Sequence, residues 1–250
     1  MVRLSVNVNK VATLRNSRGG TEPRLSDAVA VCLAEGVGGI TVHPRADQRH
    51  ITPGDVRDLA AQLVDVRPRV EFNIEGDPRP DLLALVHDVR PEQCTLVPVR
   101  PGEITSQAGW HDGPEADRLP GVIAALKADG IRVSVFVEPT AEGIALAAAV
   151  GADRVELYTE PYARAHEHGE VAAAVSFAQY ADAARLAHRH GLGVNAGHDL
   201  DLANLVRFRQ LPHLDEVSIG HAIMARALFE GLGPVVRAYR ALLDAAGAQR

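Results

Sequence analysis

Short runs rich in Val, Ile and Leu alternate with longer Ala- and Leu-rich stretches along the whole chain. The runs predict strands at residues 4–8, 39–43, 70–74, 93–97, 132–137, 154–158, 193–195 and 216–219. The stretches predict helices at residues 26–35, 54–66, 81–89, 120–129, 141–150, 172–190, 202–209 and 222–245. Eight repeats in 250 residues give about 31 residues each, the length of a βα unit. Strict alternation favours a parallel sheet, and eight units favour a closed (β/α)8 TIM barrel forming one domain over residues 1–250.

Glycine residues and long loops mark the boundaries of these units. Four predicted helices end at a glycine, which accepts the left-handed conformation that closes a helix. These glycines are Gly36, Gly130, Gly151 and Gly191. No GxGxxG motif follows the first predicted strand, which argues against a dinucleotide-binding sheet. Two long interruptions remain at residues 9–24 and 98–119; we expect extra short helices in the barrel and a lid loop after strand four.

Charge and composition exclude several classes of partner. A formal net charge of −6 provides no positive field for nucleic acid or an anionic membrane, and 4% aromatic residues leave few side chains for base stacking. No apolar run approaches the ~20 residues of a membrane span, and the first residues lack the apolar core of a signal peptide. Two cysteines, Cys32 and Cys94, suit a reducing compartment. We therefore expect a cytoplasmic protein that binds neither nucleic acid nor membrane.

Polar side chains gather where the predicted strands end. They are Asn7, Asn9, Lys10, His43, Arg45, His50, Asn195, His198 and His221. Active sites of α/β barrels are built at the carboxyl ends of the strands and in the loops that follow. The sequence therefore predicts one catalytic cavity surrounded by these residues.

Two carboxylates lie inside otherwise apolar predicted strands. Burial would raise the pKa of Glu71 and Glu156 and make them acids or bases near neutral pH. Glu71 shares an alternating strand face with Asn73 and Glu75, which favours a functional role. An arginine or asparagine inside the barrel could equally satisfy Glu156. His43 and His198 stand at corresponding strand ends and can move protons near pH 7, so together they indicate catalysis.

Two glycine turns predict phosphate binding. Gly197-His198-Asp199 and Gly220-His221-Ala222 follow the last two predicted strands, where barrels often bind phosphate at a helix N-terminus. Arg18, Arg45 and His50 provide further cationic or hydrogen-bonding groups, so more than one phosphate is expected. By contrast, residues 166–168 (His-Glu-His) alternate in a charged loop, which predicts a solvated surface rather than a metal site.

The chain resembles the pyridoxine 5'-phosphate synthase family of the deoxyxylulose-dependent vitamin B6 route. The resemblance covers essentially the whole chain. It is carried by residues 6–19, 39–45, 49–51, 194–198 and 219–222. It implies a transferase that condenses 3-amino-2-oxopropyl phosphate with 1-deoxy-D-xylulose 5-phosphate, giving pyridoxine 5'-phosphate, phosphate and water. It also implies a homo-octamer that needs no cofactor and no metal, with Arg18 near a subunit contact.

The resemblance implies a role for each matching residue. His43 and Glu71 would be proton acceptors, His198 the proton donor, and Glu156 would stabilise the transition state. The residues that would hold the two phosphate substrates are Asn7, Asn9, Lys10, Arg18, Arg45, His50, Thr105, Asp199, Gly220 and His221. Thr105 lies in the expected lid loop.

Three positions depart from the family pattern. The family commonly has Asp-His where this chain has Asn9-Lys10, and a glycine where Asp199 stands. An amide at Asn9 keeps hydrogen-bonding capacity but loses basicity, while Lys10 adds a positive charge near a sugar phosphate. The Asp199 side chain would repel phosphate if it turned inward.

Two other readings of the residues stay open. A metal-dependent barrel could use His43, Glu71, Glu156 and His198 as ligands, since this mixture suits a divalent ion. A non-catalytic protein that binds phosphorylated metabolites could keep the barrel without the chemistry; the three departures are its support.

Overall fold

The computed structural model describes residues 2–99 and 108–247. Eight parallel strands form a closed barrel in which each strand pairs with the next and β8 pairs with β1. The strands are β1 (Arg3–Asn7), β2 (Gly39–Val42), β3 (Glu71–Gly76), β4 (Gln93–Leu96), β5 (Arg132–Val137), β6 (Arg154–Leu157), β7 (Gly193–Ala196) and β8 (Leu214–Ile219). The (β/α)8 barrel predicted from the alternation of strands and helices is confirmed.

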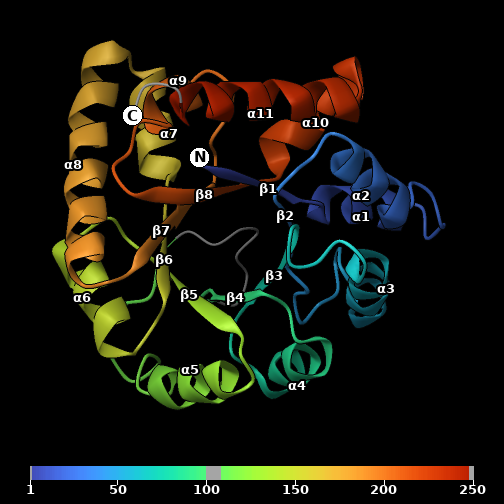
Figure 1. Cartoon of the computed structure of the whole chain (residues 1–250), viewed down its shortest axis with the longest axis horizontal. Helices are drawn as coiled ribbons and strands as arrows, with labels where there is room; N and C mark the ends of the chain where they lie inside the picture. The colour runs from blue at the N-terminus through green and yellow to red at the C-terminus, as the bar shows by residue number, and fades with distance from the viewer. Residues whose placement is uncertain (1, 100–107, 248–250) are drawn as a thin grey trace.

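Helices surround the strands on the outside of the barrel. They are α1 (Asn9–Asn16), α2 (Leu25–Ala34), α3 (Pro53–Leu63), α4 (Pro80–Val89), α5 (Leu119–Ala128), α6 (Ala141–Ala149), α7 (Glu160–Glu167), α8 (Glu170–Arg189), α9 (Leu205–Phe208), α10 (His221–Glu230) and α11 (Leu232–Gly247). Figure 1 shows the ring running from α2 and α3 through α4 and α5 to α6 and α8, with α11 completing it. Contacts between α11 and α2 bring the two ends of the chain together.

The hydrophobic core lies between the strands and this ring of helices. Outward-facing strand residues such as Ile40, Ile74 and Val133 are fully buried there. The barrel interior is instead polar, in contrast to the branched apolar layers usual in such barrels. Ser5 and Thr41, for example, share a buried hydrogen bond of 2.7 Å between their hydroxyl oxygens. The barrel is therefore stabilised by apolar packing between the strands and the helices and by hydrogen bonds between side chains in its interior.

Three segments differ from the predicted elements. The helix expected over residues 222–245 is broken into α10 and α11 at Gly231, whose φ of +82° interrupts the helical backbone. Helix α1 occupies the first half of the long interruption after β1. The charged segment after β6 forms α7, where Glu160 in the first turn and basic residues in the last turn complement the helix dipole.

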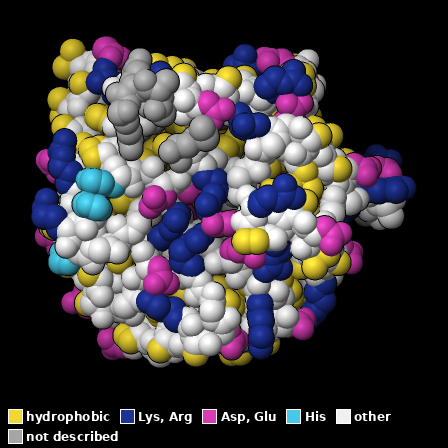
Figure 2. All heavy atoms as spheres, viewed as in Figure 1, with side chains coloured by type: hydrophobic (Ala, Val, Ile, Leu, Met, Phe, Trp, Pro, Cys, Tyr) yellow, Lys and Arg dark blue, Asp and Glu magenta, His cyan; other side chains and the backbone are white. Residues whose placement is uncertain are grey.

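Charges on the surface are mixed rather than segregated. In Figure 2, Lys and Arg side chains gather near the middle of the face shown, with acidic side chains between them. Over the residues described, no helix has the length and apolar character needed to cross a membrane.

Candidate active site

A cavity of about 1080 Å³ opens at the carboxyl ends of the strands. The structure brings most of the predicted site residues into its wall. These are Asn7, Asn9, Lys10, His43, Arg45, His50, Glu156, His198, Asp199, Gly220 and His221. They come from the first, second, sixth, seventh and eighth βα units, so closure of the barrel is what collects them.

One side of the cavity is organised around His43 and Glu75. The Asn9 side-chain oxygen accepts a 2.9 Å hydrogen bond from the backbone N–H of His43, and the Asn7 amide donates to Glu75 Oε2 at 3.4 Å. Nδ1 of His43 lies 3.8 Å from the same Glu75 oxygen. Nε2 of His43 is buried and has no hydrogen-bond partner among the described residues, so a ligand can supply one.

Burial controls the protonation of this pair. Desolvation, together with the positive charges of Arg45 and Arg79, lowers the pKa of His43 to about 3. Burial and the neighbouring Glu156 raise the pKa of Glu75 well above its ordinary value. The cavity therefore holds a neutral imidazole, which can accept a proton, beside a carboxylic acid that can give one up.

Glu156 projects into the same cavity from β6. Burial, reinforced by the negative charge of Glu216, raises the pKa of Glu156 to about 7, while His198 acts in the opposite direction. Such a carboxyl group is part protonated at neutral pH and can act as acid or base.

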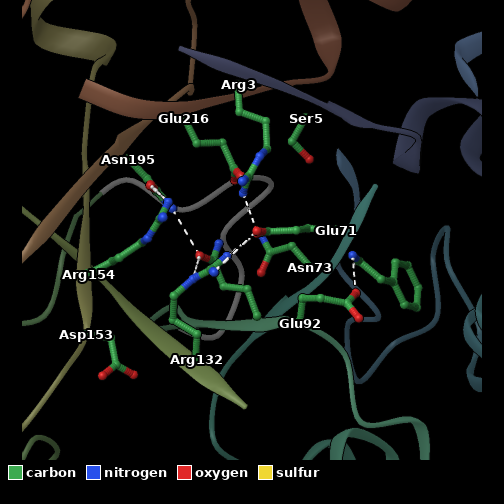
Figure 3. A network of polar contacts seen from close by, with 12 residues as sticks. Arg3, Ser5, Glu71, Asn73, Glu92, Arg132, Asp153, Arg154, Asn195 and Glu216 are labelled. Atoms are coloured by element: carbon green, nitrogen blue, oxygen red, sulfur yellow. Dashed lines mark hydrogen bonds and ion pairs between the residues drawn. The ribbon is translucent and has the colours of Figure 1, made fainter. Parts of the chain in front are cut away.

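The structure places Glu71 elsewhere. Glu71 is the first residue of β3, at the amino-terminal end of the barrel, and it is not part of the cavity wall. Its carboxylate pairs with Arg3 at 2.5 Å and with Arg132, as Figure 3 shows. Glu75 shares its strand face but stands four residues further on, roughly 13 Å along the strand. Glu71 therefore lies away from the cavity in which its proton-acceptor role was expected, and Glu75 occupies the position facing His43.

The charges around Glu71 form a network that fills the amino-terminal end of the barrel (Figure 3). Arg132 also donates to the Gln93 side chain at 3.0 Å, and Arg154 donates to Asn195 Oδ1 at 2.9 Å. Because Arg3 and Arg132 pair with Glu71, the network accounts for a carboxylate at this end of the barrel.

Arg45, Lys10 and His50 line the part of the cavity next to His43. Burial, Arg45 and Lys10 lower the pKa of His50 to about 4. His50 Nδ1 accepts from the backbone N–H of Ile51 at 2.9 Å, which fixes the ring. Arg15 bridges α1 to Asp55 of α3 at 2.5 Å and so holds this part of the cavity together.

The two glycine turns line the cavity after β7 and β8. A Cβ atom at Gly197 would come within 1.9 Å of the Ser218 carbonyl oxygen, so only glycine fits there. Gly220 packs against Asn7 and precedes α10, whose first backbone N–H groups can receive an anion. The Ser218 hydroxyl lines the cavity and has no partner among the residues described, which leaves it open to a ligand.

Besides Glu71, two predicted site residues are not among those that line the cavity. Arg18 is exposed in the turn after α1 and does not line the cavity. Thr105, with residues 100–107 of the expected lid loop, lies outside the described residues.

Sequence reasoning also missed several cavity residues. Glu75 could have been chosen over Glu71, because it is the acidic residue nearer the carboxyl end of its strand. Glu160, Arg164 and His166 line the cavity from α7, although residues 166–168 were expected to form solvated surface. Within residues 2–99 and 108–247, no three His, Cys, Asp or Glu side chains are placed to hold a metal ion.

A closed α/β barrel with buried acid–base groups and two glycine turns around a cavity at the carboxyl ends of its strands is typical of an enzyme. The family described as "Pyridoxal phosphate biosynthesis protein PdxJ" matches residues 4–245. The chain belongs to this family.

Individual relatives agree with that assignment. Pyridoxine 5'-phosphate synthase from Xanthomonas oryzae is 52% identical over 246 residues, covering 95% of each chain. The synthase from Bacteroides fragilis is 51% identical, covering 96% of this chain and 98% of that one. Among solved structures, phosphoribosyl anthranilate isomerase from Thermotoga maritima aligns with a TM-score of 0.60 at 11% identity, covering 98% of this chain and all of that one. The similarity to this isomerase concerns the barrel fold alone.

Proposed function

We propose that this chain is a pyridoxine 5'-phosphate synthase that condenses 3-amino-2-oxopropyl phosphate with 1-deoxy-D-xylulose 5-phosphate. The products are pyridoxine 5'-phosphate, phosphate and water, and the enzyme is a transferase. Family membership and relatives at about half identity support this reaction. The observation that carries it is the convergence of His43, Glu75 and His198 on one cavity that also holds two glycine turns.

Two regions of the cavity suit the two phosphate groups. The turns that contain Gly197 and Gly220 present backbone N–H groups to one anion. Arg45 and Lys10 also line the cavity and provide positive charge for a second, beside the neutral imidazole of His50. The reacting carbonyl and amine then meet between these two regions, beside the buried carboxyl groups.

The proposed chemistry uses proton transfers at these groups. Attack of the amine on the ketone requires a base, and loss of water requires an acid. The neutral His43 imidazole accepts a proton, and Glu75 exchanges protons with the substrate as the ring forms. His198 donates a proton to a departing oxygen, and Glu156 stabilises charge that develops in the transition state.

Asn9 and Lys10 fit this arrangement despite their departure from the family pattern. Asn9 holds the backbone of His43 through its side-chain oxygen, a contact that needs an acceptor but no charge. Lys10 stands at the cavity wall and adds a positive charge near His50. Asn9 therefore supports the position of His43, and Lys10 supports phosphate binding.

We further propose a cytoplasmic homo-octamer. Leu228 and Phe229 on α10 are 72% and 89% exposed, and Leu14 on the neighbouring α1 is 52% exposed. Large apolar side chains concentrated on adjoining helices are typical of association surfaces. Light scattering of the purified protein tests the octamer; a monomer at micromolar concentration would contradict it.

The decisive experiment incubates purified protein with both phosphates and follows pyridoxine 5'-phosphate by absorbance and mass spectrometry. We expect product only when both substrates are present. Binding of both phosphates without product would instead identify a non-catalytic metabolite-binding protein. Elemental analysis of the same protein tests the remaining alternative, a metal-dependent barrel. Such a protein would hold stoichiometric metal and lose activity with a chelator.

A further inference from the structure

The imidazole of His198 is paired with the side chain that follows it. Nδ1 of His198 lies 3.0 Å from Oδ2 of Asp199, within hydrogen-bond distance. The two side chains are 32% and 41% exposed, and both line the cavity. The Asp199 carboxylate is thus directed at His198, an arrangement that the sequence alone did not predict.

The backbone holds this contact in place at an energetic cost. Asp199 has a φ of +62°, a left-handed conformation that is unfavourable for residues other than glycine. Two hydrogen bonds hold the backbone of the turn. The Asn204 side chain donates to the Asp199 carbonyl at 3.0 Å, and the Thr159 hydroxyl donates to the His198 carbonyl. A carboxylate kept in a glycine-favouring position by buried neighbours indicates that the side chain has a function.

The contact determines which imidazole nitrogen carries a proton. The hydrogen bond from His198 keeps the pKa of Asp199 below its ordinary value, so the side chain is an ionised acceptor. An ionised carboxylate can only accept, and therefore Nδ1 of His198 must donate. Proton exchange with the substrate then falls to Nε2, the other ring nitrogen, which accepts a proton in the neutral ring and donates it when the ring is protonated at both nitrogens.

We propose that Asp199 is a positioning residue that fixes the tautomer and ring orientation of His198 for proton transfer through Nε2. The catalytic consequence rests on the proposed synthase function, whereas the tautomer assignment does not. Asp199 also lies close enough to His221 and Arg164 for both to act on its charge. The permanent positive charge of Arg164 offsets part of a negative charge that would otherwise weaken phosphate binding at the neighbouring turn.

Two variants test the contribution of the Asp199 carboxylate to the state of His198. D199N keeps the size of the side chain but replaces the ionised acceptor with an amide that can donate or accept. D199G removes the side chain and relieves the left-handed backbone, so the turn should stay folded. E160Q is the matched control, because it removes a negative charge from the same cavity wall at a residue that does not bond to His198.

Magic-angle-spinning NMR of protein labelled with ¹⁵N-histidine reads the tautomer directly at a pH where the imidazoles are neutral. The His198 signal is assigned by its loss in H198Q. We expect the Nδ1–H tautomer in the wild type and in E160Q, and a mixture or the Nε2–H tautomer in D199N and D199G. An unchanged tautomer in both Asp199 variants would overturn the proposal, whether or not the protein makes pyridoxine 5'-phosphate.

Steady-state kinetics test the catalytic consequence. A general acid–base group contributes about 10²–10⁴-fold, so loss of its orientation should lower kcat roughly tenfold. KM for either phosphate substrate should stay unchanged or fall, because a negative charge has left the cavity. A changed KM with an unchanged kcat would assign Asp199 to substrate binding and refute the positioning role. Absence of turnover in the wild type would count against the synthase function alone.

Discussion

Nδ1 of His43 lies 3.8 Å from Oε2 of Glu75, and these two side chains are only 10% and 11% exposed. They meet because β2 and β3 are neighbours and both residues stand at the carboxyl ends of those strands. Burial lowers the pKa of His43 and raises that of Glu75. Both groups therefore favour their neutral forms, so the cavity holds an uncharged proton acceptor beside an uncharged proton donor.

Replacing Glu75 with Gln should abolish most of the turnover. The amide keeps the shape and can still accept from Asn7, but it cannot exchange a proton, so kcat should fall by about 10²–10⁴-fold. Thermal unfolding should show no loss of stability, because the variant removes an acidic group that burial disfavours. Turnover within a few-fold of wild type would exclude Glu75 as a proton-transfer residue.

Replacing Glu71 with Gln should have the opposite outcome. Arg3 and Arg132 would lose their charged partner at the amino-terminal end of the barrel, which should lower the free energy of unfolding by about 2–3 kcal/mol. The site lies away from the cavity, so kcat of the folded enzyme should stay within about twofold. Chemical denaturation and initial rates measure the two effects; a stable but inactive E71Q protein would return the catalytic role to Glu71.

Glu156→Gln should change how stability depends on pH. The folded pKa of Glu156 is about 7, above its ordinary value of 4.5, so the folded state binds more protons between these pH values. Wild-type stability therefore carries a penalty that grows as pH rises from about 4.5 to 7 and reaches roughly 3 kcal/mol above that range.

The variant lacks this penalty, so its stability relative to wild type should rise across the same window and level off above it. Subtracting the free energy of unfolding of the wild type from that of the variant cancels the contributions of His43 and His50. These two residues titrate in both proteins, and their contributions have the opposite sign. Urea denaturation at several pH values gives the comparison. A constant difference from pH 4.5 to 8 would show that Glu156 is not perturbed in this way.

Gly197→Ala should destabilise the fold. Its Cβ would sit 1.9 Å from the Ser218 carbonyl oxygen, and because that atom belongs to the backbone of β8 the strand itself would have to move. We expect a loss of at least about 2 kcal/mol, seen as a lower midpoint in thermal unfolding. Gly121→Ala is the control: no atom lies within 4 Å of the added carbon, and alanine favours the helix by about 0.5 kcal/mol. Equal midpoints for the two variants would contradict the close packing.

Local sequence patterns were sufficient for the barrel. Each predicted strand overlaps an observed one, because a parallel strand covered by helices reads as a β-branched run between turns. Local patterns were less reliable for the short α1 and α7, whose polar sequences depend on the loops around them. The break at Gly231 was missed for a related reason: a single glycine is tolerated within a helix, and only its surroundings decide whether it ends one.

Some features of the candidate site could likewise be predicted from the sequence, and others could not. That polar residues at strand ends share a cavity follows from the chain alone, since parallel strands in a closed barrel all end on one side. Position along the predicted strand favours Glu75 over Glu71, but the pairing of Glu71 with Arg3 and Arg132 required the tertiary structure. The contact of Asp199 with His198 could not be inferred either, as it depends on a left-handed backbone held by Asn204 and Thr159.

The amino-acid order by itself determined the eightfold βα alternation, the closed parallel barrel and the side on which polar groups collect, because these depend on periodicity and short-range turns. The tertiary structure alone decided which carboxylates are buried beside a histidine and which are neutralised by arginines. Those outcomes depend on distances between residues far apart in the chain, and proton affinities follow from such distances and from burial.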